Sequence, residues 1–95
     1  MRVYRCRKGV ILTEICGTYL LVAAKGAREY CSAVREINET AAFIWKRVLE
    51  GDSFAEVIDA LGAEYVFPDY DTAEKKISEF MEEMVANGYF TVEKE

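Results

Sequence analysis

The spacing of the apolar residues changes at Asn38. Upstream, apolar and β-branched residues come in short continuous runs, whereas downstream they recur every three or four positions. Short runs of this kind indicate strands, and the second spacing indicates amphipathic helices. The sequence therefore predicts strands followed by helices, which is the order of an α+β domain.

Three runs upstream of Asn38 predict strands: residues 10–15 (VILTEI), 18–24 (TYLLVAA) and 30–37 (YCSAVREI). Gly17 lies between the first two, and we expect it at the first central position of a two-residue type II′ turn. The third run is more polar than the others and leads directly into the first helix. Residues 1–8 fit either a further short strand or a loose arm.

The first helix is predicted to start at Asn38, whose side chain can accept hydrogen bonds from the free N–H groups of the first turn. Glu39 suits the positive end of the helix dipole, and Gly51 suits the C-terminal end. Its apolar stripe is formed by Ala41, Ala42, Ile44, Trp45, Val48 and Leu49. We therefore assign Asn38, Glu39 and Thr40 to the cap and first turn, and Trp45 to the core.

Two more helices follow. Residues 53–56 have the serine-to-glutamate spacing of a capping box, which predicts the start of the second helix. The third is expected to begin at Asp71, after a proline-containing loop of residues 66–71, and to end at residues 87–88. Residues 89–93 are compatible with a short terminal strand.

Composition narrows the classes of protein. A hydrophobic fraction of 52% in 95 residues excludes disorder and favours a single folded domain that spans residues 1–95. No apolar run reaches the roughly 18–20 residues of a membrane span. The N-terminal apolar run is broken at Thr13 and Glu14, so we expect no signal peptide and a cytoplasmic protein.

The cysteines and the absence of histidine argue against catalysis. Cys6, Cys16 and Cys31 form no C-x-x-C pair, and the chain has no histidine. A disulfide framework, a structural zinc site and a histidine-activated cysteine nucleophile are therefore not expected. Cys16 and Cys31 lie in strand-like segments and are predicted to be buried free thiols. The sequence predicts no enzyme activity, no cofactor and no metal.

Charge bears on nucleic-acid binding. Residues 1–36 carry seven Lys and Arg against three acids, and residues 37–95 carry five against fourteen. The helix pair resembles a helix-turn-helix with a following wing, so a winged-helix DNA-binding regulator is one alternative. However, Glu79, Glu82 and Glu83 on the third helix would repel phosphates. We expect no nucleic-acid partner and no membrane partner.

Peptide binding is a third possibility. An outer strand of a small sheet has unpaired N–H and C=O groups, and a peptide can add to it as a further strand. The strand of residues 30–37 is the candidate because it lies next to the helical half in sequence. The same edge could instead pair with a second copy of the chain, which would make it a homodimerisation module.

The stretch INETAAFIW, residues 37–45, resembles the signature of the PqqD-like family (pyrroloquinoline-quinone biosynthesis protein D), also called RiPP recognition elements. The likeness continues through the hairpin of residues 11–22 and the helices of residues 53–61 and 71–90, covering about residues 9–92. It implies a three-stranded antiparallel sheet followed by a winged-helix-like bundle of three helices. It also implies a non-catalytic protein that binds the leader of a ribosomally made precursor peptide and presents it to a modifying enzyme, often a radical-SAM maturase.

The resemblance also implies where the leader would lie, along the third strand and against the third helix. The strand wall would be Tyr30, Cys31, Ser32, Ala33, Val34 and Arg35, and the helix wall would be Ala73, Lys76, Ile77, Phe80 and Glu83, with Met84 deeper. By spacing alone, Ile77 and Phe80 are core residues, which is compatible with a place in the floor of the groove, and Lys76 and Arg35 are surface charges. Alternatively, those two cations pair with an acidic residue of the leader.

Overall fold

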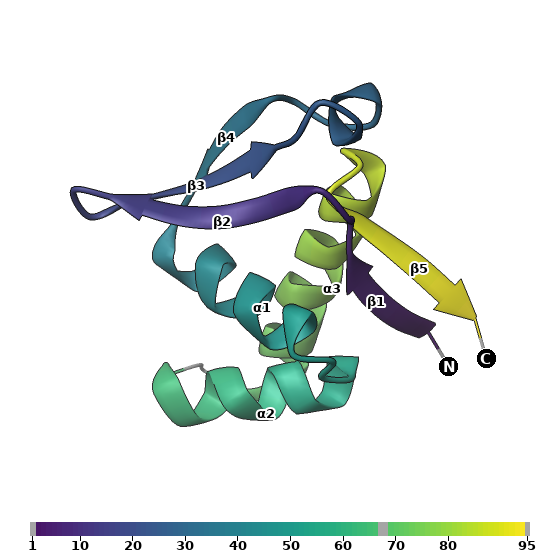
Figure 1. Ribbon diagram of the computed structural model, residues 1–95. Helices are drawn as coiled ribbons and strands as arrows, with labels where there is room; N and C mark the ends of the chain where they lie inside the picture. The colour runs from purple at the N-terminus through teal and green to yellow at the C-terminus, as the bar shows by residue number, and fades with distance from the viewer. Residues whose placement is uncertain (1, 67–68, 95) are drawn as a thin grey trace.

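The computed structural model describes residues 2–66 and 69–94. Three antiparallel strands form a sheet in the order β2-β3-β4, and three helices lie on one side of it (Figure 1). The strands are β2 (Val10–Ile15), β3 (Thr18–Ala23) and β4 (Val34–Ile37). The predicted α+β architecture is confirmed.

The β2–β3 turn differs from the prediction. Ile15 pairs with Thr18, which leaves Cys16 and Gly17 as the two central residues. Both have positive φ, 50° and 81°, which is the pattern of a type I′ turn. Gly17 therefore takes the second central position, and the type II′ prediction is wrong. Cys16 is exposed at this turn, so its predicted burial is also wrong.

The third strand starts later than predicted. A short 3-10 helix, η1 (Ala27–Glu29), precedes it, and the backbone N–H groups of Tyr30 and Cys31 both donate to the Ala27 carbonyl. These hydrogen bonds continue a helical turn through residues 30–31. The chain becomes extended only afterwards, and regular β4 begins at Val34.

The first helix, α1 (Glu39–Leu49), has the predicted cap. The Asn38 side-chain oxygen accepts from the Ala41 N–H at 2.8 Å. At the other end, Gly51 has a φ of 97°. Both boundaries follow from hydrogen bonding and backbone freedom within a few residues, so sequence alone could predict them.

Replacing Asn38 by alanine is expected to lower the free energy of unfolding by about 1 kcal/mol, because an N–H of the first turn loses its acceptor. Asn38→Asp keeps an acceptor at the same position and is expected to retain the stability. Urea denaturation of both variants measures the difference. An equal loss in both would mean that the cap does not account for the effect.

The second helix, α2 (Phe54–Glu64), begins with the predicted capping box, in which both reciprocal hydrogen bonds between Ser53 and Glu56 are present. The hydrogen bond from the Ser53 N–H to the Glu56 carboxylate lowers the pKa of that carboxyl. The third helix, α3 (Tyr70–Ala86), starts earlier than predicted, because Asp69 and not Asp71 caps it by accepting from the Thr72 N–H. Phe67 and Pro68 of the predicted loop lie outside the described residues.

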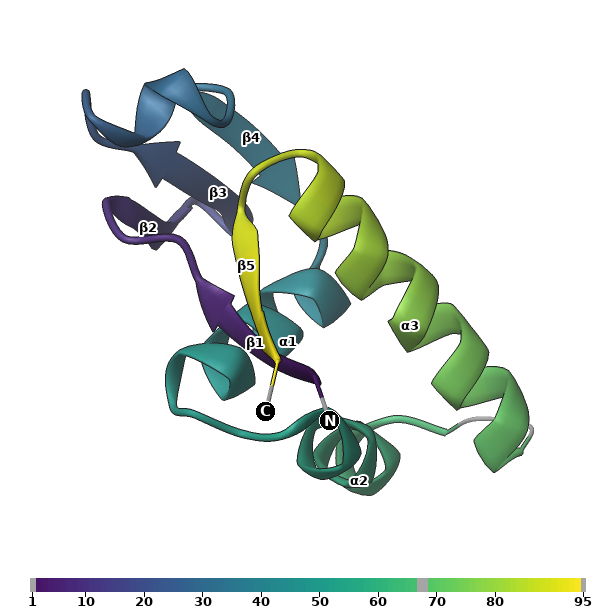
Figure 2. The same ribbon diagram turned by 90° about the vertical axis from the view of Figure 1, so that its right-hand side faces the viewer.

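The two ends of the described chain pair with each other. Strands β1 (Arg2–Cys6) and β5 (Phe90–Lys94) form an antiparallel two-stranded sheet beside the helices (Figure 2). The alternative left open for residues 1–8 is thereby decided in favour of a strand, and the terminal strand is confirmed. No helix within residues 2–66 and 69–94 has the length and apolar character needed to cross a membrane.

The core joins these elements around Trp45. The indole is 1% exposed and stacks on the Phe90 ring, with centroids 5.5 Å apart and planes 18° apart. Leu21 of β3, Leu61 of α2 and Met81 of α3 are each 0% exposed in the same cluster. The sheet, the helices and β5 are therefore held together by one apolar interior.

Candidate functional site

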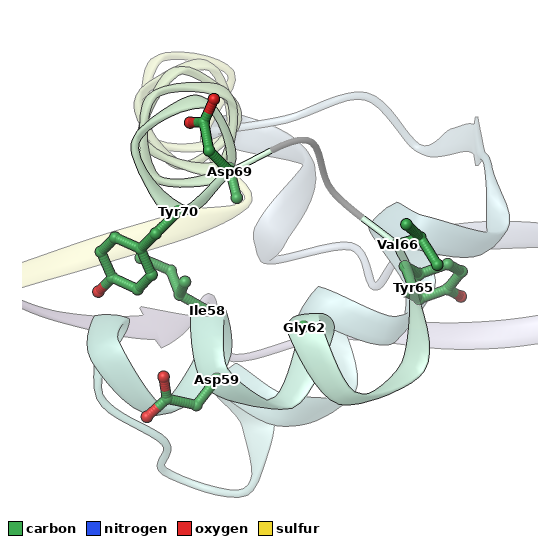
Figure 3. A pocket seen from close by; sticks show the side chains of 8 residues that line it. Ile58, Asp59, Gly62, Tyr65, Val66, Asp69 and Tyr70 are labelled. Atoms are coloured by element: carbon green, nitrogen blue, oxygen red, sulfur yellow. The ribbon is translucent and has the colours of Figure 1, made fainter.

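A pocket of about 460 Å³ lies between α2 and the start of α3 (Figure 3). It is lined by Ile58, Asp59, Gly62, Tyr65, Val66, Asp69, Tyr70 and Ala73. The Asp69 carboxylate is engaged with the Thr72 N–H at 2.7 Å, and the hydrogen bonds to it lower its pKa. Of the residues predicted to bind a peptide, Ala73 alone lines this pocket, so it is not the predicted site.

The outer strand β4 has a free edge. It pairs with β3 on one side, and its other side has no strand neighbour among the described residues. The Ala23 N–H donates to the Ala33 carbonyl at 2.8 Å, just before the strand. Because hydrogen-bonded pairs alternate in an antiparallel ladder, Arg35 and Ile37 also bond to β3. The main-chain groups of Val34 and Glu36 therefore point away from the sheet.

Side chains of β4 alternate between the two faces of the sheet. Arg35 lies opposite Leu21, which is fully buried, so the Arg35 and Ile37 side chains lie on the helix side. Both are half-buried. Val34, with 55% of its surface exposed, and Glu36 lie on the outer side. The edge thus offers the N–H and C=O groups of Val34 and Glu36. The side chains of Val34 and Glu36 lie on its outer side, and those of Arg35 and Ile37 lie on its helix side.

Helix α3 approaches β4 at its C-terminal end (Figure 2). The Arg35 guanidinium is 2.6 Å from a Glu83 carboxylate oxygen. Lys76, Phe80 and Glu83 lie at helical spacing along one stripe of α3. The half-buried Phe80 packs edge-on against the Phe90 ring at 6.4 Å. We call Val34, Arg35, Glu36, Ile37 and these three α3 residues the β4–α3 face.

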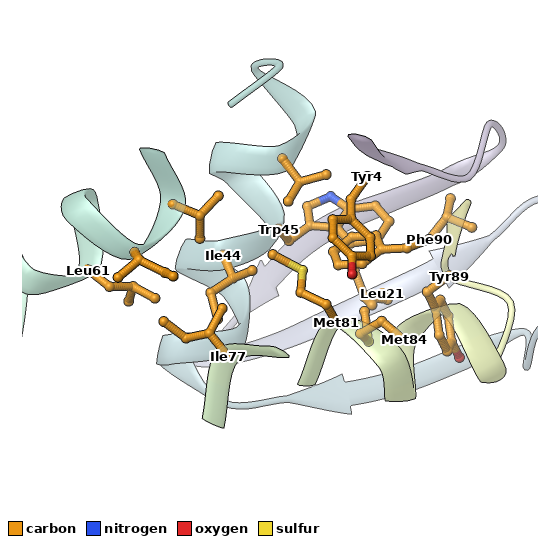
Figure 4. Packing of buried hydrophobic residues seen from close by; sticks show 14 of the residues in the cluster. Tyr4, Leu21, Ile44, Trp45, Leu61, Ile77, Met81, Met84, Tyr89 and Phe90 are labelled. Atoms are coloured by element: carbon orange, nitrogen blue, oxygen red, sulfur yellow. The ribbon is translucent and has the colours of Figure 1, made fainter. Parts of the chain in front are cut away.

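The remaining α3 residues predicted to bind a peptide are covered. Ala73, Ile77 and Met84 are 2%, 4% and 0% exposed. Figure 4 shows Ile77 and Met84 packed among the other core side chains. They support α3 from behind and do not contribute to its exposed surface.

The loop before β4 is fixed to the end of α3. Gly88 has a φ of 86°, and a Cβ placed on it would lie 2.0 Å from the Tyr30 carbonyl oxygen. Arg7 donates through Nε to the Gly88 carbonyl, and its guanidinium lies 4.0 Å from the Tyr30 ring centroid. The predicted residue Tyr30 is therefore held by contacts within the protein. Ser32 and Ala33, which follow it, are exposed.

Tyr89 is a residue that the sequence analysis did not assign to the site. It is 1% exposed, and its hydroxyl has no hydrogen-bond partner among the described residues. The Arg35 guanidinium lies 5.5 Å from its ring centroid, which places Tyr89 behind the β4–α3 face. The available signal was its position directly after the glycine that ends α3, but only the fold brings it next to Arg35.

Two thiols are held in the protonated form. Burial raises the pKa of Cys6 to about 12. Burial also raises the pKa of Cys31, with the charge of Arg7 opposing it, and the Cys31 thiol donates to the Ala27 carbonyl. Neither therefore offers a reactive thiolate at neutral pH. Within residues 2–66 and 69–94, no three cysteine or acidic side chains converge as metal ligands would.

A three-stranded sheet with an open outer strand, followed by three helices, defines a winged-helix-like domain. The chain belongs to the PqqD family, because the family model described as Coenzyme PQQ synthesis protein D matches residues 17–89. The resemblance drawn from residues 37–45 is confirmed. No curated protein sequence matches the chain.

Two solved structures share the fold. A chain described as lasso peptide synthetase B1 complexed with the leader peptide has a TM-score of 0.76 and 25% identity, covering 94% of this chain and 98% of that one. A chain described as TbiB1 in complex with the TbiA(beta) leader peptide has a TM-score of 0.77 and 19% identity, covering 96% of this chain and 99% of that one. At 19% identity the second likeness concerns the fold alone.

Proposed function

We propose that this chain is a non-catalytic peptide-binding protein that captures the leader segment of a ribosomally made precursor peptide. The leader adds to β4 as a further strand, beside α3, and is presented to a modifying enzyme. The observation that carries the proposal is the free edge of β4 at Val34 and Glu36, in a chain of the PqqD family. The similar lasso peptide synthetase B1 chain, which was solved with a leader peptide, supports it.

The energetics of strand addition fit a recognition role. Two N–H and two C=O groups can form hydrogen bonds that each contribute about 0.5–1.5 kcal/mol net. Such bonds are independent of sequence, so discrimination must come from the peptide side chains. Alternate side chains of the added strand would lie beside Val34 and Glu36 on the outer side, and beside Arg35 and Ile37 on the helix side. The helix-side positions would also meet α3.

The charge of α3 opposes the DNA-binding alternative. Glu74, Glu79 and Glu83 are exposed on this helix, and a phosphate backbone would meet like charge. Arg35, a cation of the β4–α3 face, is already paired with Glu83. A peptide that bonds to the main chain of β4 avoids this repulsion.

The partners beyond the leader are part of the same proposal. We infer a cytoplasmic protein working with a peptide-modifying enzyme, for which a radical-SAM maturase is the candidate from the family resemblance. Genes for such an enzyme and for a short precursor next to this gene would support it. Homodimerisation through β4 would compete with leader binding, and light scattering with and without peptide separates the two.

Hydrogen exchange tests the binding edge at single-residue resolution. The experiment adds the synthetic leader of a precursor encoded beside the gene. The amides of Val34 and Glu36 are then expected to exchange at about one tenth of their rate in the free protein, or more slowly still. Those of Arg35 and Ile37, already bonded to β3, are expected to change little. Amide-resolved NMR at matched pH measures all four.

The opposite edge of the sheet is the internal control. By the same alternation, Leu12 and Glu14 of β2 direct their N–H groups away from β3. Slowed exchange at these two amides, with no change at β4, would move the site to β2. Slowing at neither edge would contradict strand addition altogether.

A further inference from the structure

Arg35, Glu83 and Tyr89 form a cluster with unused hydrogen-bonding capacity. One nitrogen of Arg35 contacts one Glu83 oxygen at 2.6 Å, and the two side chains are 31% and 55% exposed. The Tyr89 ring lies beneath the guanidinium, 5.5 Å from it. The Tyr89 hydroxyl is buried and has no hydrogen-bond partner within residues 2–66 and 69–94, and Figure 4 shows it turned away from Trp45 and Phe90 at the margin of the core.

A buried hydroxyl without a partner destabilises a fold, which makes it unusual unless another molecule supplies the missing group. A phenolic O–H donates readily to a carboxylate. Arg35 has five N–H donors in a planar fork that matches a carboxylate, and one of them meets Glu83. Because both side chains are partly exposed to solvent, which screens the pair, it is weak and readily exchanged. The cluster therefore presents donors that suit an acidic group.

Strand addition places a peptide side chain at this cluster. Val34 and Glu36 would form the hydrogen bonds to the peptide, so the peptide residue between those bonds lies directly opposite Arg35. Directly opposite side chains share a face, with Cβ atoms about 4.5–5.5 Å apart. The side chain of that one residue therefore projects toward the helix side, where Arg35 and Tyr89 lie.

We propose that the bound peptide is anchored there by an aspartate or glutamate, which takes the Arg35 guanidinium from Glu83 and accepts a hydrogen bond from the Tyr89 hydroxyl. This rests on the proposed function and specifies its substrate class: an extended peptide with one acidic residue facing α3. Glu83 holds Arg35 in position until the peptide arrives. Arg35 provides charge recognition, and Tyr89 provides the second donor.

The test uses a phage-displayed library of random 12-residue peptides, selected separately on the wild-type protein and on three variants. Arg35→Gln removes the charge, Tyr89→Phe removes the hydroxyl, and Lys75→Gln is a control for losing one positive charge on α3. We expect Asp and Glu to be enriched several-fold at one aligned position by the wild type and by Lys75→Gln. Arg35→Gln is expected to lose this enrichment, and Tyr89→Phe to reduce it, while apolar positions persist.

A double-mutant cycle gives the same answer for one peptide. Exchanging the acidic residue of a selected peptide for its amide should weaken binding to the wild type about tenfold and leave binding to Arg35→Gln unchanged. Tyr89→Phe should not lower the thermal midpoint, because the hydroxyl has no partner in the part of the chain that the structure describes. A lowered midpoint would show an internal partner and overturn the role of Tyr89.

Failure of the inference and failure of the proposed function give different results. Selected peptides without an acidic position, or with one that persists on Arg35→Gln, would overturn the acidic anchor while supporting peptide capture. No enrichment of any peptide by the wild type would contradict peptide capture itself, and the anchor with it.

Discussion

Replacing Gly88 by alanine is expected to lower the free energy of unfolding by about 2–5 kcal/mol. Gly88 has a φ of 86°, a conformation that costs other residues stability. The new Cβ would also lie 2.0 Å from the Tyr30 carbonyl oxygen and 2.6 Å from its carbon. Since both are backbone atoms, relief requires moving the loop before β4 away from α3. Urea denaturation monitored by circular dichroism measures the loss.

Two other glycines separate the cost of the positive φ from the cost of the contact with the Tyr30 backbone. Gly51 has a φ of 97°, and apart from its chain neighbours no described residue comes within 4 Å of the position that a Cβ would take, so Gly51→Ala should show only the conformational cost, about 1–2 kcal/mol. Gly62 is helical, and outside its own helix no described residue comes within 4 Å of the position that a Cβ would take, so Gly62→Ala should stabilise by up to about 1 kcal/mol. A Gly88→Ala loss no larger than that of Gly51→Ala would mean that the Tyr30 loop yields easily.

Val34→Pro is expected to leave the protein folded and to weaken peptide binding at least about tenfold, or 1.4 kcal/mol. Proline has no N–H, and the Val34 N–H is directed to the open edge, where no other strand of the described chain pairs with it. A peptide strand would lose that donor and meet the proline ring in its place. Fluorescence anisotropy with a labelled peptide selected on the wild type measures affinity, and denaturation checks the fold.

Arg35→Pro is the matched variant one residue along the strand. Its N–H bonds to β3, so the substitution should cost much more stability than Val34→Pro does. If Val34→Pro unfolds the protein while Arg35→Pro is tolerated, the direction of the main-chain groups is the reverse of our assignment. If Val34→Pro binds peptide as the wild type does, the peptide does not add to β4.

Features that depend on a few neighbouring residues were predictable from the sequence. Asn38 and the capping box at Ser53 act through hydrogen bonds to N–H groups three positions away. The predicted start of α3 was wrong because two acids, Asp69 and Asp71, both suit the capping role. The predicted type of the β2–β3 turn was wrong because the type depends on which residues of the two strands pair across the turn. That register buries Leu21, and the burial is decided by the helices beneath the sheet.

In the candidate site, too, local features were predictable from the sequence and contacts between distant residues were not. Arg35 and Glu83 were both named from the sequence, yet their contact joins residues 48 positions apart and no local pattern predicts it. The covered positions of Ile77 and Met84 were foreseeable from helical spacing. The role of Tyr89 was not, because only the folded arrangement buries its hydroxyl with no partner among the described residues.

The pairing of β1 with β5 has a consequence for synthesis of the protein. The two strands are joined by contacts such as that of Arg5 with Glu93, which lie 88 positions apart in the sequence. Closing so long a segment is slow compared with forming the β2–β3 hairpin, whose partners are adjacent. On a ribosome, β1 emerges first, but it cannot pair until β5 has been synthesised. The core residues Tyr89 and Phe90 are also added late. The domain is therefore expected to become competent for recognition only after β5 has left the ribosome.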